Sequence, residues 1–193
     1  MGRSAVWGSV AEADRPEHSP NRYDRGVTAS ATPAIALLVR AGIAHDVHEY
    51  TAAERHGTAR HDRPDFGEEA AAAIGVEPAR MGKTLIVSVD GELLAAVVPV
   101  DRRLDLKALA AVVGHRHAEL AEPAAAERAT GSVVGGISPL GMRRRLPVVI
   151  DASLLEHPTI LVSAGRRGLQ LELAPGELVT LVSASIGAIS KSV

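Results

Sequence analysis

One lysine and one glycine-rich segment have the residue types and positions that suggest chemistry. Lys83 stands in "ARMGKTLIVSV", where the chain enters an apolar run. A cation at a strand end can hold a phosphate or an ester oxygen. A lysine there is more often a surface residue whose stem lies along the sheet, and sequence position alone does not separate the two interpretations.

The glycine loop, "TGSVVGGISPLGMRRRLP" at residues 130–147, is the second candidate. Glycine and proline mark ordinary turns, but a long connector inside a compact domain is more often functional than idle. The adjacent Gly135 and Gly136 let backbone N–H groups approach a ligand, and such donors can stabilise an oxyanion. The segment has neither the P-loop motif nor the dinucleotide-binding GxGxxG motif.

Two arginine clusters accompany glycine turns. Arg143, Arg144 and Arg145 stand in the glycine loop, and Arg166 and Arg167 stand in "SAGRRG". A charge run is usually a solvated surface. Because two such clusters occur in a chain of net charge −2, binding of a phosphate-rich partner is about as plausible as a solvated surface. Because the whole chain is not basic, nucleic acid would have to be bound by a local patch, and we expect no general DNA binding.

Other catalytic groups are not evident. The chain has no cysteine, which excludes disulfides, thiolate zinc sites and a cysteine nucleophile. The histidines form no HExxH motif, and Ser138 and Ser163 lack a GxSxG context. We therefore expect no metal, no cofactor and no internal nucleophile–base pair. A hydrolase of this kind would work by positioning and electrostatics.

Composition limits the class of protein. The chain has 193 residues, of which 46% are hydrophobic and 23% charged, so one domain with a sizeable core is expected. Aromatic residues make up 2%, too few for a platform that stacks bases. No apolar run approaches the roughly 20 residues of a membrane span, and no signal peptide is evident. We expect a cytoplasmic protein without a membrane partner.

Residues 1–29 are polar without periodicity, which predicts a mobile extension before a domain at 30–193. Thr32 is a suitable N-cap and Gly42 a suitable end for the first helix. The Asp90-Gly91 pair predicts a hairpin. We expect strands at 43–50, 83–89, 92–100, 116–120, 146–151, 159–165 and 168–173. We expect helices at 33–42, 66–75, 106–113, 122–131 and, as one or two helices, 175–189.

Strands and helices thus alternate irregularly, which favours a mixed sheet with helices around it. The chain also resembles the YbaK-type aminoacyl-tRNA deacylases, relatives of the editing domain of bacterial prolyl-tRNA synthetases. The resemblance runs from about Thr32 to Ile189. It depends on the segments "TPAIALL", "KTLIVSV", "LDLKALA", "ERATGSVVGGISPLGMRRRLP" and "ILVSAGRRGLQLEL".

The resemblance implies an α/β fold with a mixed, barrel-like sheet surrounded by helices. It implies that Lys83 is the key lysine of the family and Gly135 the loop glycine near the ester. Tyr50 and Ser163 would be pocket residues, and the adjacent Gly136, Ile137 and Ser138 would also contact substrate. The two arginine clusters would face the acceptor end of an aminoacyl-tRNA.

The implied activity is removal of a wrong amino acid from tRNA, with cysteine on proline tRNA as the expected substrate and prolyl-tRNA synthetase as a candidate partner. The thiol of the substrate would attack its own ester. Two alternatives stay open: an alanine or serine deacylase that uses water, and a non-catalytic module that binds tRNA or a synthetase. Gln170 stands where many relatives have an acidic residue, and the loop between Tyr50 and Phe66 is longer than usual.

Overall fold

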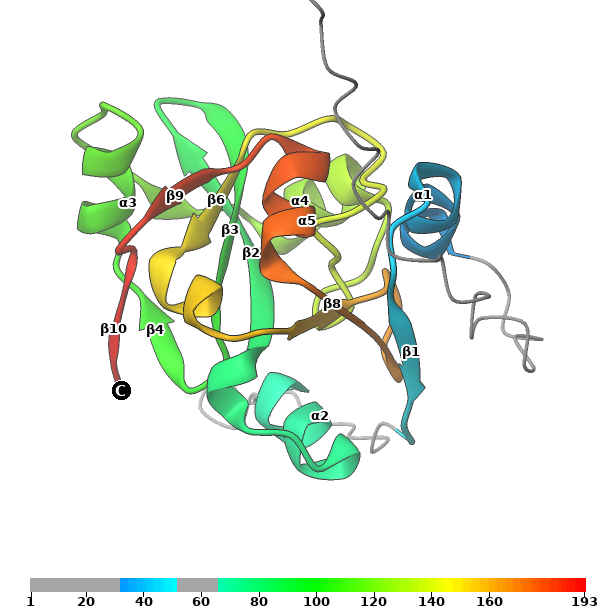
Figure 1. The fold of residues 1–193 in the computed structure, drawn as a ribbon. Coiled ribbons are helices and arrows are strands. Elements are labelled where there is room, and N and C mark those ends of the chain that lie inside the picture. Colours follow the sequence, from blue (N-terminus) through cyan, green and yellow to red (C-terminus); the bar gives the residue numbers. More distant parts are fainter. Residues whose placement is uncertain (1–31, 52–65) are drawn as a thin grey trace, which may run out of the picture.

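The computed structural model describes residues 32–51 and 66–193. Eight strands form a mixed sheet in the order β1-β8-β7-β2-β3-β6-β9, with β5 paired to β2, and β4 pairs separately with β10. Helices lie around the sheet (Figure 1), so the expected α/β architecture is confirmed. The strands are β1 (Asp46–Glu49), β2 (Met81–Val89), β3 (Glu92–Pro99), β4 (Arg102–Leu104), β5 (Glu119–Leu120), β6 (Val148–Asp151), β7 (Ile160–Ser163), β8 (Leu169–Leu173), β9 (Ser185–Gly187) and β10 (Ser190–Ser192).

The first helix begins and ends at the capping residues that the sequence predicts. Thr32 Oγ1 accepts the N–H of Ile35 at 3.3 Å, and Gly42 ends the first helix with φ 67°. Asp105 caps another helix, and Gly131 ends the one before the glycine loop with φ 78°. The helices are α1 (Pro33–Ala41), α2 (Phe66–Ile74), α3 (Leu106–Val112), α4 (Pro123–Thr130) and α5 (Pro175–Val182), with short 3₁₀ helices η1 (Pro78–Arg80) and η2 (Ala152–Glu156).

The predicted hairpin joins β2 and β3. Asp90 and Gly91 have φ of 50° and 88°, and the flanking residues Val89 and Glu92 pair in register. Two positive φ values at the turn match the right-handed twist of the strands, which is why Asp-Gly is favoured there. The long antiparallel ladder that follows brings Lys83 opposite Val98, close to the far end of the hairpin.

The core lies on both faces of the sheet. Apolar residues of α1, α4 and α5 pack with one face, around β3, β6, β7 and β8. On the opposite face, α3 packs against β2 and β3, and α2 packs against the first residue of β2 and the middle of β7. The helices therefore fix the position of β2, which lies in the middle of the strand order.

The prediction for residues 175–189 is wrong in its second half. The helix ends at Val182, Ser183 adopts a left-handed conformation with φ 54°, and β9 pairs in parallel with β6. β4 and β10 were not expected, because three polar or exposed residues give no alternation signal and the two strands pair across a long sequence separation. The strands expected at 43–50 and 116–120 are shorter than predicted.

The extension expected at residues 1–29 lies outside the described residues, as does most of the loop between Tyr50 and Phe66. Among the helices of the described ranges, none is both long and apolar enough to cross a membrane.

Candidate active site

One edge of β2 is only partly paired. β2 runs beside β3 over nearly its whole length. On its other edge it pairs with β7 at Met81 and Gly82 and with β5 at Val87 and Ser88. Residues 83–86 between these two contacts have no strand partner on that edge within the described part of the chain. The sheet therefore opens at this point.

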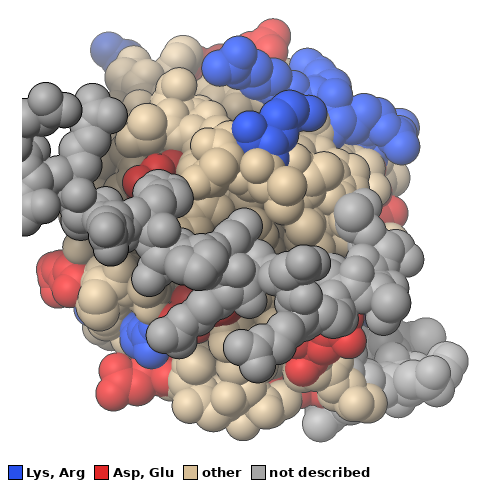
Figure 2. Space-filling model, turned by 45° about the vertical axis from the view of Figure 1, so that its right-hand side comes forward, with Lys and Arg blue, Asp and Glu red and all other residues tan. Residues whose placement is uncertain are grey.

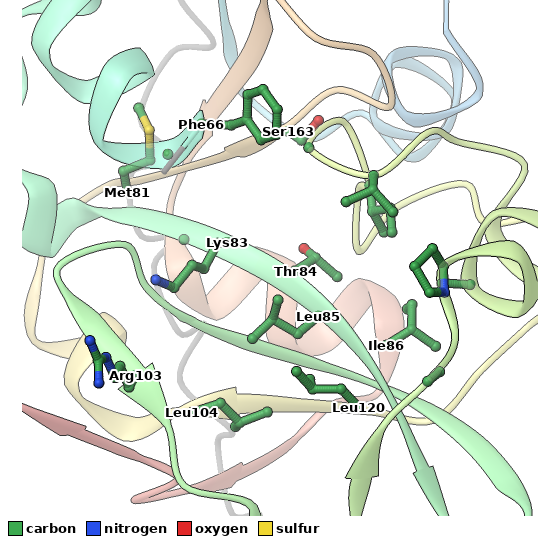
Figure 3. Close-up of a pocket in the computed structure, with 18 of the residues that line it drawn as sticks. Phe66, Met81, Lys83, Thr84, Leu85, Ile86, Arg103, Leu104, Leu120 and Ser163 are labelled. Atoms are coloured by element: carbon green, nitrogen blue, oxygen red, sulfur yellow. The ribbon is translucent and has the colours of Figure 1, made fainter. Parts of the chain in front are cut away.

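A cavity of about 560 Å³ lies at this opening. All residues from 81 to 86 line it, and since alternate side chains of a strand point to opposite faces, the cavity reaches the strand edge itself. Phe66 and Gly135 form part of the remaining wall, and Arg103 and Leu104 of β4 line another part (Figure 3). The volume is that of a small-molecule site, so it can admit one end of a large ligand.

Lys83 points into this region from β2 (Figure 3). Its side chain is half-buried, and Nζ donates to the carbonyl oxygen of Val100 at 2.9 Å. That bond holds the ammonium group beside the cavity and limits its freedom. The functional interpretation of Lys83 thus has the geometry it requires, a cation at a cavity wall.

The glycine loop is held in one conformation by side chains. Glu127 Oε1 accepts the N–H of Val134 at 3.0 Å. Arg167 donates to the carbonyl oxygen of Val134 through Nε at 3.1 Å and through a terminal nitrogen at 2.6 Å. Ser163 Oγ donates to the carbonyl oxygen of Gly136 at 2.9 Å. These bonds position the part of the loop that faces the cavity.

Glycine is required at both positions of the Gly135-Gly136 pair. Gly135 has φ 87°, and a Cβ there would lie 2.6 Å from Cδ2 of Phe66. A Cβ on Gly136 would lie 2.9 Å from the backbone nitrogen of Arg167. Both contacts are too short for a real side chain. The pair therefore allows the loop to approach α2 and the turn after β7 closely.

Two backbone donors of the loop remain available at the cavity. Gly135 and Ile137 both line it, and neither N–H donates to another group in the part of the chain that the structure describes. By contrast, the N–H of Gly136 donates to the carbonyl oxygen of Val133 at 2.9 Å. Unused N–H groups at a cavity can stabilise negative charge on a carbonyl oxygen.

The charged residues of the cavity wall are cations. Among the described lining residues, Lys83 and Arg103 are charged, and there is no carboxylate and no histidine. No cluster of three or more potential metal-ligating side chains occurs in residues 32–51 and 66–193. The described wall therefore offers positive charge and hydrogen-bond donors, but no group suited to remove a proton from water.

The other expected pocket residues divide into two groups. Ser163 and Ile137 line the cavity, and Ser163 is 8% exposed. Ser138 lies buried beside it, where its Oγ accepts the N–H of Leu140 at 3.1 Å. Tyr50 packs against an apolar cluster that includes Met81 and two alanines of α2, and neither Tyr50 nor Gly136 is among the described lining residues. Contact with substrate stays a prediction for all five residues, which are Tyr50, Gly136, Ile137, Ser138 and Ser163.

The two arginine clusters have different surroundings. Arg143, Arg144 and Arg145 are exposed on the glycine loop. Arg166 is exposed and lies 3.6 Å from Glu49. Arg167 stacks on the ring of Phe66, with 4.4 Å from the guanidinium carbon to the ring centre, in addition to its bonds with the loop. Lys and Arg gather near the top of the face shown in Figure 2. Arg167 thus has a structural role at the cavity wall.

Among the polar, charged and aromatic lining residues, the sequence did not assign Phe66, Thr84, Arg103 and Gln170 to the site. Thr84 follows Lys83 directly, and Gln170 interrupts an apolar strand, "LQLEL", at a position that is 6% exposed. A buried glutamine between leucines is unusual, and this was a signal that the sequence contained. Nothing in the sequence pointed to Phe66 or Arg103, because their roles depend on contacts between distant segments.

A polar network is centred on Glu172 of β8, which is not among the described lining residues of the cavity. Glu172 Oε1 accepts hydrogen bonds from Arg80 at 2.6 Å and from Thr159 at 2.5 Å, and Oε2 lies 2.8 Å from His48 Nε2. Burial opposes ionisation of Glu172, but bonds from Thr159 and His48 and the charge of Arg80 outweigh it, so the pKa lies below its usual value. The network joins β1, η1 and β8.

Comparison with known proteins identifies the family. Residues 64–181 match the family described as "Aminoacyl-tRNA editing domain". The chain belongs to this family. Its members are aminoacyl-tRNA deacylases. An Enterococcus faecalis protein named "Putative Cys-tRNA(Pro)/Cys-tRNA(Cys) deacylase EbsC" is 31% identical over 164 residues, which cover 84% of this chain and 95% of that protein.

Two further editing-family relatives are similar. The proline–tRNA ligase of Moorella thermoacetica is 36% identical over 98 residues, which are 51% of this chain and 17% of the ligase. A solved structure titled as that of a putative trans-editing enzyme for prolyl tRNA synthetase superposes with a TM-score of 0.72 at 26% identity, over 86% of this chain and 100% of the other. The stated resemblance to the editing family is thus confirmed.

Proposed function

We propose that this protein is a trans-editing deacylase whose substrate is Cys-tRNA(Pro). The observation that supports this most is the composition of the cavity wall. It combines Lys83 with the unused N–H groups of Gly135 and Ile137, and its described residues include no carboxylate and no histidine that could activate water or a hydroxyl group. Such a site suits an ester that brings its own nucleophile, and cysteine is the amino acid whose side chain supplies one.

In the proposed reaction, the cysteinyl thiolate attacks the carbonyl carbon of its own ester. A carbon–sulfur bond forms, and negative charge develops on the carbonyl oxygen. The N–H groups of Gly135 and Ile137 stabilise that charge. The carbon–oxygen bond to the ribose then breaks, the ribose oxygen takes up a proton from water, and a cyclic thiolactone leaves. Lys83 supplies positive charge beside the departing oxygen.

The proposed substrate enters by its acceptor end, since the cavity holds only a small group. Arg143, Arg144, Arg145 and Arg166 would bind tRNA phosphates, whereas Arg167 acts mainly by holding the glycine loop. The name of the Enterococcus faecalis relative supports cysteine as the amino acid. The relation to part of proline–tRNA ligases supports proline tRNA, with prolyl-tRNA synthetase as a partner and the cytoplasm as the compartment.

A panel of Cys-, Ala-, Ser- and Pro-tRNA(Pro) tests the proposal. Each ester is incubated with the purified protein, and the loss of aminoacyl-tRNA is compared with spontaneous hydrolysis. We expect rapid loss of Cys-tRNA(Pro) and little acceleration for the other three. Preferential cleavage of Ala- or Ser-tRNA would replace the proposed substrate, and turnover of none of the four would indicate a binding module.

A further inference from the structure

Two polar atoms at the cavity have no hydrogen-bond partner. Gln170 Oε1 and Thr84 Oγ1 are both shielded from solvent, both residues line the cavity, and neither atom has a partner among the described residues. Gln170 as a whole is 6% exposed. Unpartnered buried polar atoms are costly, and native proteins contain few of them. Two of them on one cavity indicate that a ligand supplies the missing partners.

The register of the sheet places Gln170 near the glycine loop. Gln170 on β8 pairs with Ser163 on β7, and Ser163 Oγ donates to the carbonyl oxygen of Gly136. Side chains directly opposite in an antiparallel pair lie about 5 Å apart at Cβ. A ligand group bound by Gln170 is therefore a close neighbour of a carbonyl held by the N–H of Gly135.

We infer that Gln170 accepts a hydrogen bond from the α-amino group of the aminoacyl ester. The inference rests on the proposed function. In every aminoacyl ester, the amino group is the donor attached next to the carbonyl carbon. Lys83 and Arg103 repel a charged ammonium, and no carboxylate occurs among the described lining residues to attract one. An amide oxygen is a neutral acceptor that suits this group.

This contact makes Gln170 a positioning residue. Fixing the amino group and the carbonyl oxygen of the substrate leaves only the side chain of the amino acid to be oriented. When the amino group and the carbonyl oxygen are both held, the thiol of cysteine is directed toward the carbonyl carbon that it attacks. The contact is common to all amino acids, so it contributes to rate and binding and not to the choice between cysteine and serine.

The test removes the amino group from the substrate and the amide from the protein. kcat/KM is measured for Cys-tRNA(Pro) and for the 3-mercaptopropionyl ester, which keeps the thiol and lacks the amino group. We expect wild-type protein to prefer the cysteinyl ester. The ratio of its two kcat/KM values should be about tenfold larger than the same ratio for the variant Gln170→Leu. Gln170→Leu should melt no lower than wild type, because it removes an unpartnered buried atom. Gln170→Glu should keep the preference, since a carboxylate also accepts.

Two further variants provide a second measurement and a control. Gln170→Met keeps the length of the side chain without its amide oxygen and should also lose the preference, which keeps the inference testable if Gln170→Leu does not fold. Thr180→Val changes an exposed threonine of α5 and should match wild type. An equal preference in wild type and in both cavity variants would overturn the inference. The inference would also be overturned if Gln170→Leu no longer discriminated between Cys- and Ser-tRNA but kept the wild-type preference for the ester that has an amino group.

Failure of the proposed function is distinguishable from failure of this inference. If wild-type protein cleaves neither ester, the proposed function is wrong. The amino contact is then tested by binding alone, with adenosine carrying either a 3′-alanylamido or a 3′-propionylamido group. Tighter binding of the alanyl compound, abolished in Gln170→Leu, supports the contact, and equal binding of the two compounds overturns it.

Discussion

Lys83 differs in its surroundings from the other lysines of the described chain. Lys107 and Lys191 are exposed, and Lys191 lies 3.6 Å from Asp105. Lys83 is half-buried in β2, and its ammonium is held by the carbonyl oxygen of Val100 beside the cavity. A cation kept in place at a cavity wall can act on a developing charge without reorganising, which an exposed lysine cannot do.

Replacing Lys83 by alanine should greatly reduce deacylation and leave the fold intact. We expect kcat/KM to fall by about a hundredfold or more, the size of effect seen when one electrostatic group of an active site is removed. Lys107→Ala, in the exposed part of α3, is the matched control and should keep full activity. Melting curves report folding. Wild-type turnover by a folded Lys83→Ala protein would exclude this residue from the reaction.

Gly135→Ala should be more harmful than the same change at another glycine with positive φ. Gly75 has φ 81° with nothing within 4 Å of a built Cβ, whereas a Cβ on Gly135 would collide with Phe66. Gly75→Ala should cost about 1–2 kcal/mol for its backbone conformation alone. Gly135→Ala should cost more and should also abolish activity, as measured by chemical unfolding and deacylation.

Coupling between Gly135 and Phe66 checks the cause of that difference. If the collision is the reason, Phe66→Ala should relieve part of the cost of Gly135→Ala, so the double variant is more stable than the sum of the single changes predicts. Simple additivity of the two changes would show that Phe66 does not set the requirement for glycine.

The sequence was informative for residues with unusual local patterns and uninformative for the rest. Lys83 and Gly135 stood out because of a strand end and a glycine pair, and both line one cavity. Thr84 and Gln170 also line it, but their significance lies in unpartnered atoms that only the packed structure shows. Tyr50 was expected in the pocket from resemblance; it packs against the cluster that includes Met81, and its contact with substrate stays a prediction.

At the scale of elements, the glycine loop depends on the turn between β7 and β8. Arg167 in that turn makes two bonds to Val134 and stacks on Phe66 of α2. Three segments distant in sequence therefore meet at one guanidinium group. A lysine has the same charge but cannot make the paired bonds or the flat stack.

Arg167→Lys should lower deacylation without changing how tRNA binding depends on salt. The charge is kept, so the number of phosphates bound should be the same, while the loop loses its support. Activity assays and binding titrations at several salt concentrations measure the two effects. Full activity in the variant would show that Arg167 is not needed to hold the loop, and a changed salt slope would show that the residue also contacts tRNA phosphates.

The triple change of Arg143, Arg144 and Arg145 to alanine should have the opposite pattern. These side chains are exposed, so the fold and the cavity should be unaffected. Each tRNA phosphate that the variant no longer neutralises should reduce the slope of log K against log salt by about 0.7–0.9. Binding of tRNA should weaken, and turnover at saturating tRNA should stay near that of wild type. An unchanged slope would mean that the run is only a solvated surface.

Local signals predicted most elements, and long-range pairing decided the exceptions. The caps at Thr32 and Gly42 and the Asp-Gly turn all occur where expected. The apolar run after Val182 could continue a helix, but it forms β9 because β6 offers an edge for parallel pairing. The opening beside residues 83–86 was equally unpredictable, since it depends on where β7 and β5 diverge from β2.

At the scale of the whole molecule, two carboxylates tie distant segments together. Glu172 joins β8 to η1 and β1. Asp151, at the end of β6, accepts the N–H of Ile189 at 2.9 Å and so holds the C-terminal strands. Burial opposes ionisation of Asp151, but bonds from Ser153 and the N–H of Ile189 outweigh it and hold its pKa below the usual value.

Acid should therefore destabilise the protein through these groups. Because the folded pKa of Glu172 is lowered from 4.5, its contribution to stability is complete above that pH and is lost as pH falls through the folded value. We expect the free energy of unfolding to fall as pH decreases below about 4.5 and Glu172→Gln to flatten this dependence. The exposed Glu119→Gln is the control. An unchanged dependence in Glu172→Gln would exclude the network as its source.

The measurement that tests the central claim most directly identifies the attacking group. Cys-tRNA(Pro) is compared with the nearly isosteric Ser-tRNA(Pro) and with Cys-tRNA(Pro) whose thiol has been blocked by a small group, and the first product is identified chemically. We predict fast cleavage of the cysteinyl ester alone, with a cyclic thiolactone as first product and a rate that rises as the thiol ionises. Equally fast cleavage of Ser-tRNA(Pro), or free cysteine without a thiolactone stage, would contradict the account, because water would then be the nucleophile and the protein would have to supply a base.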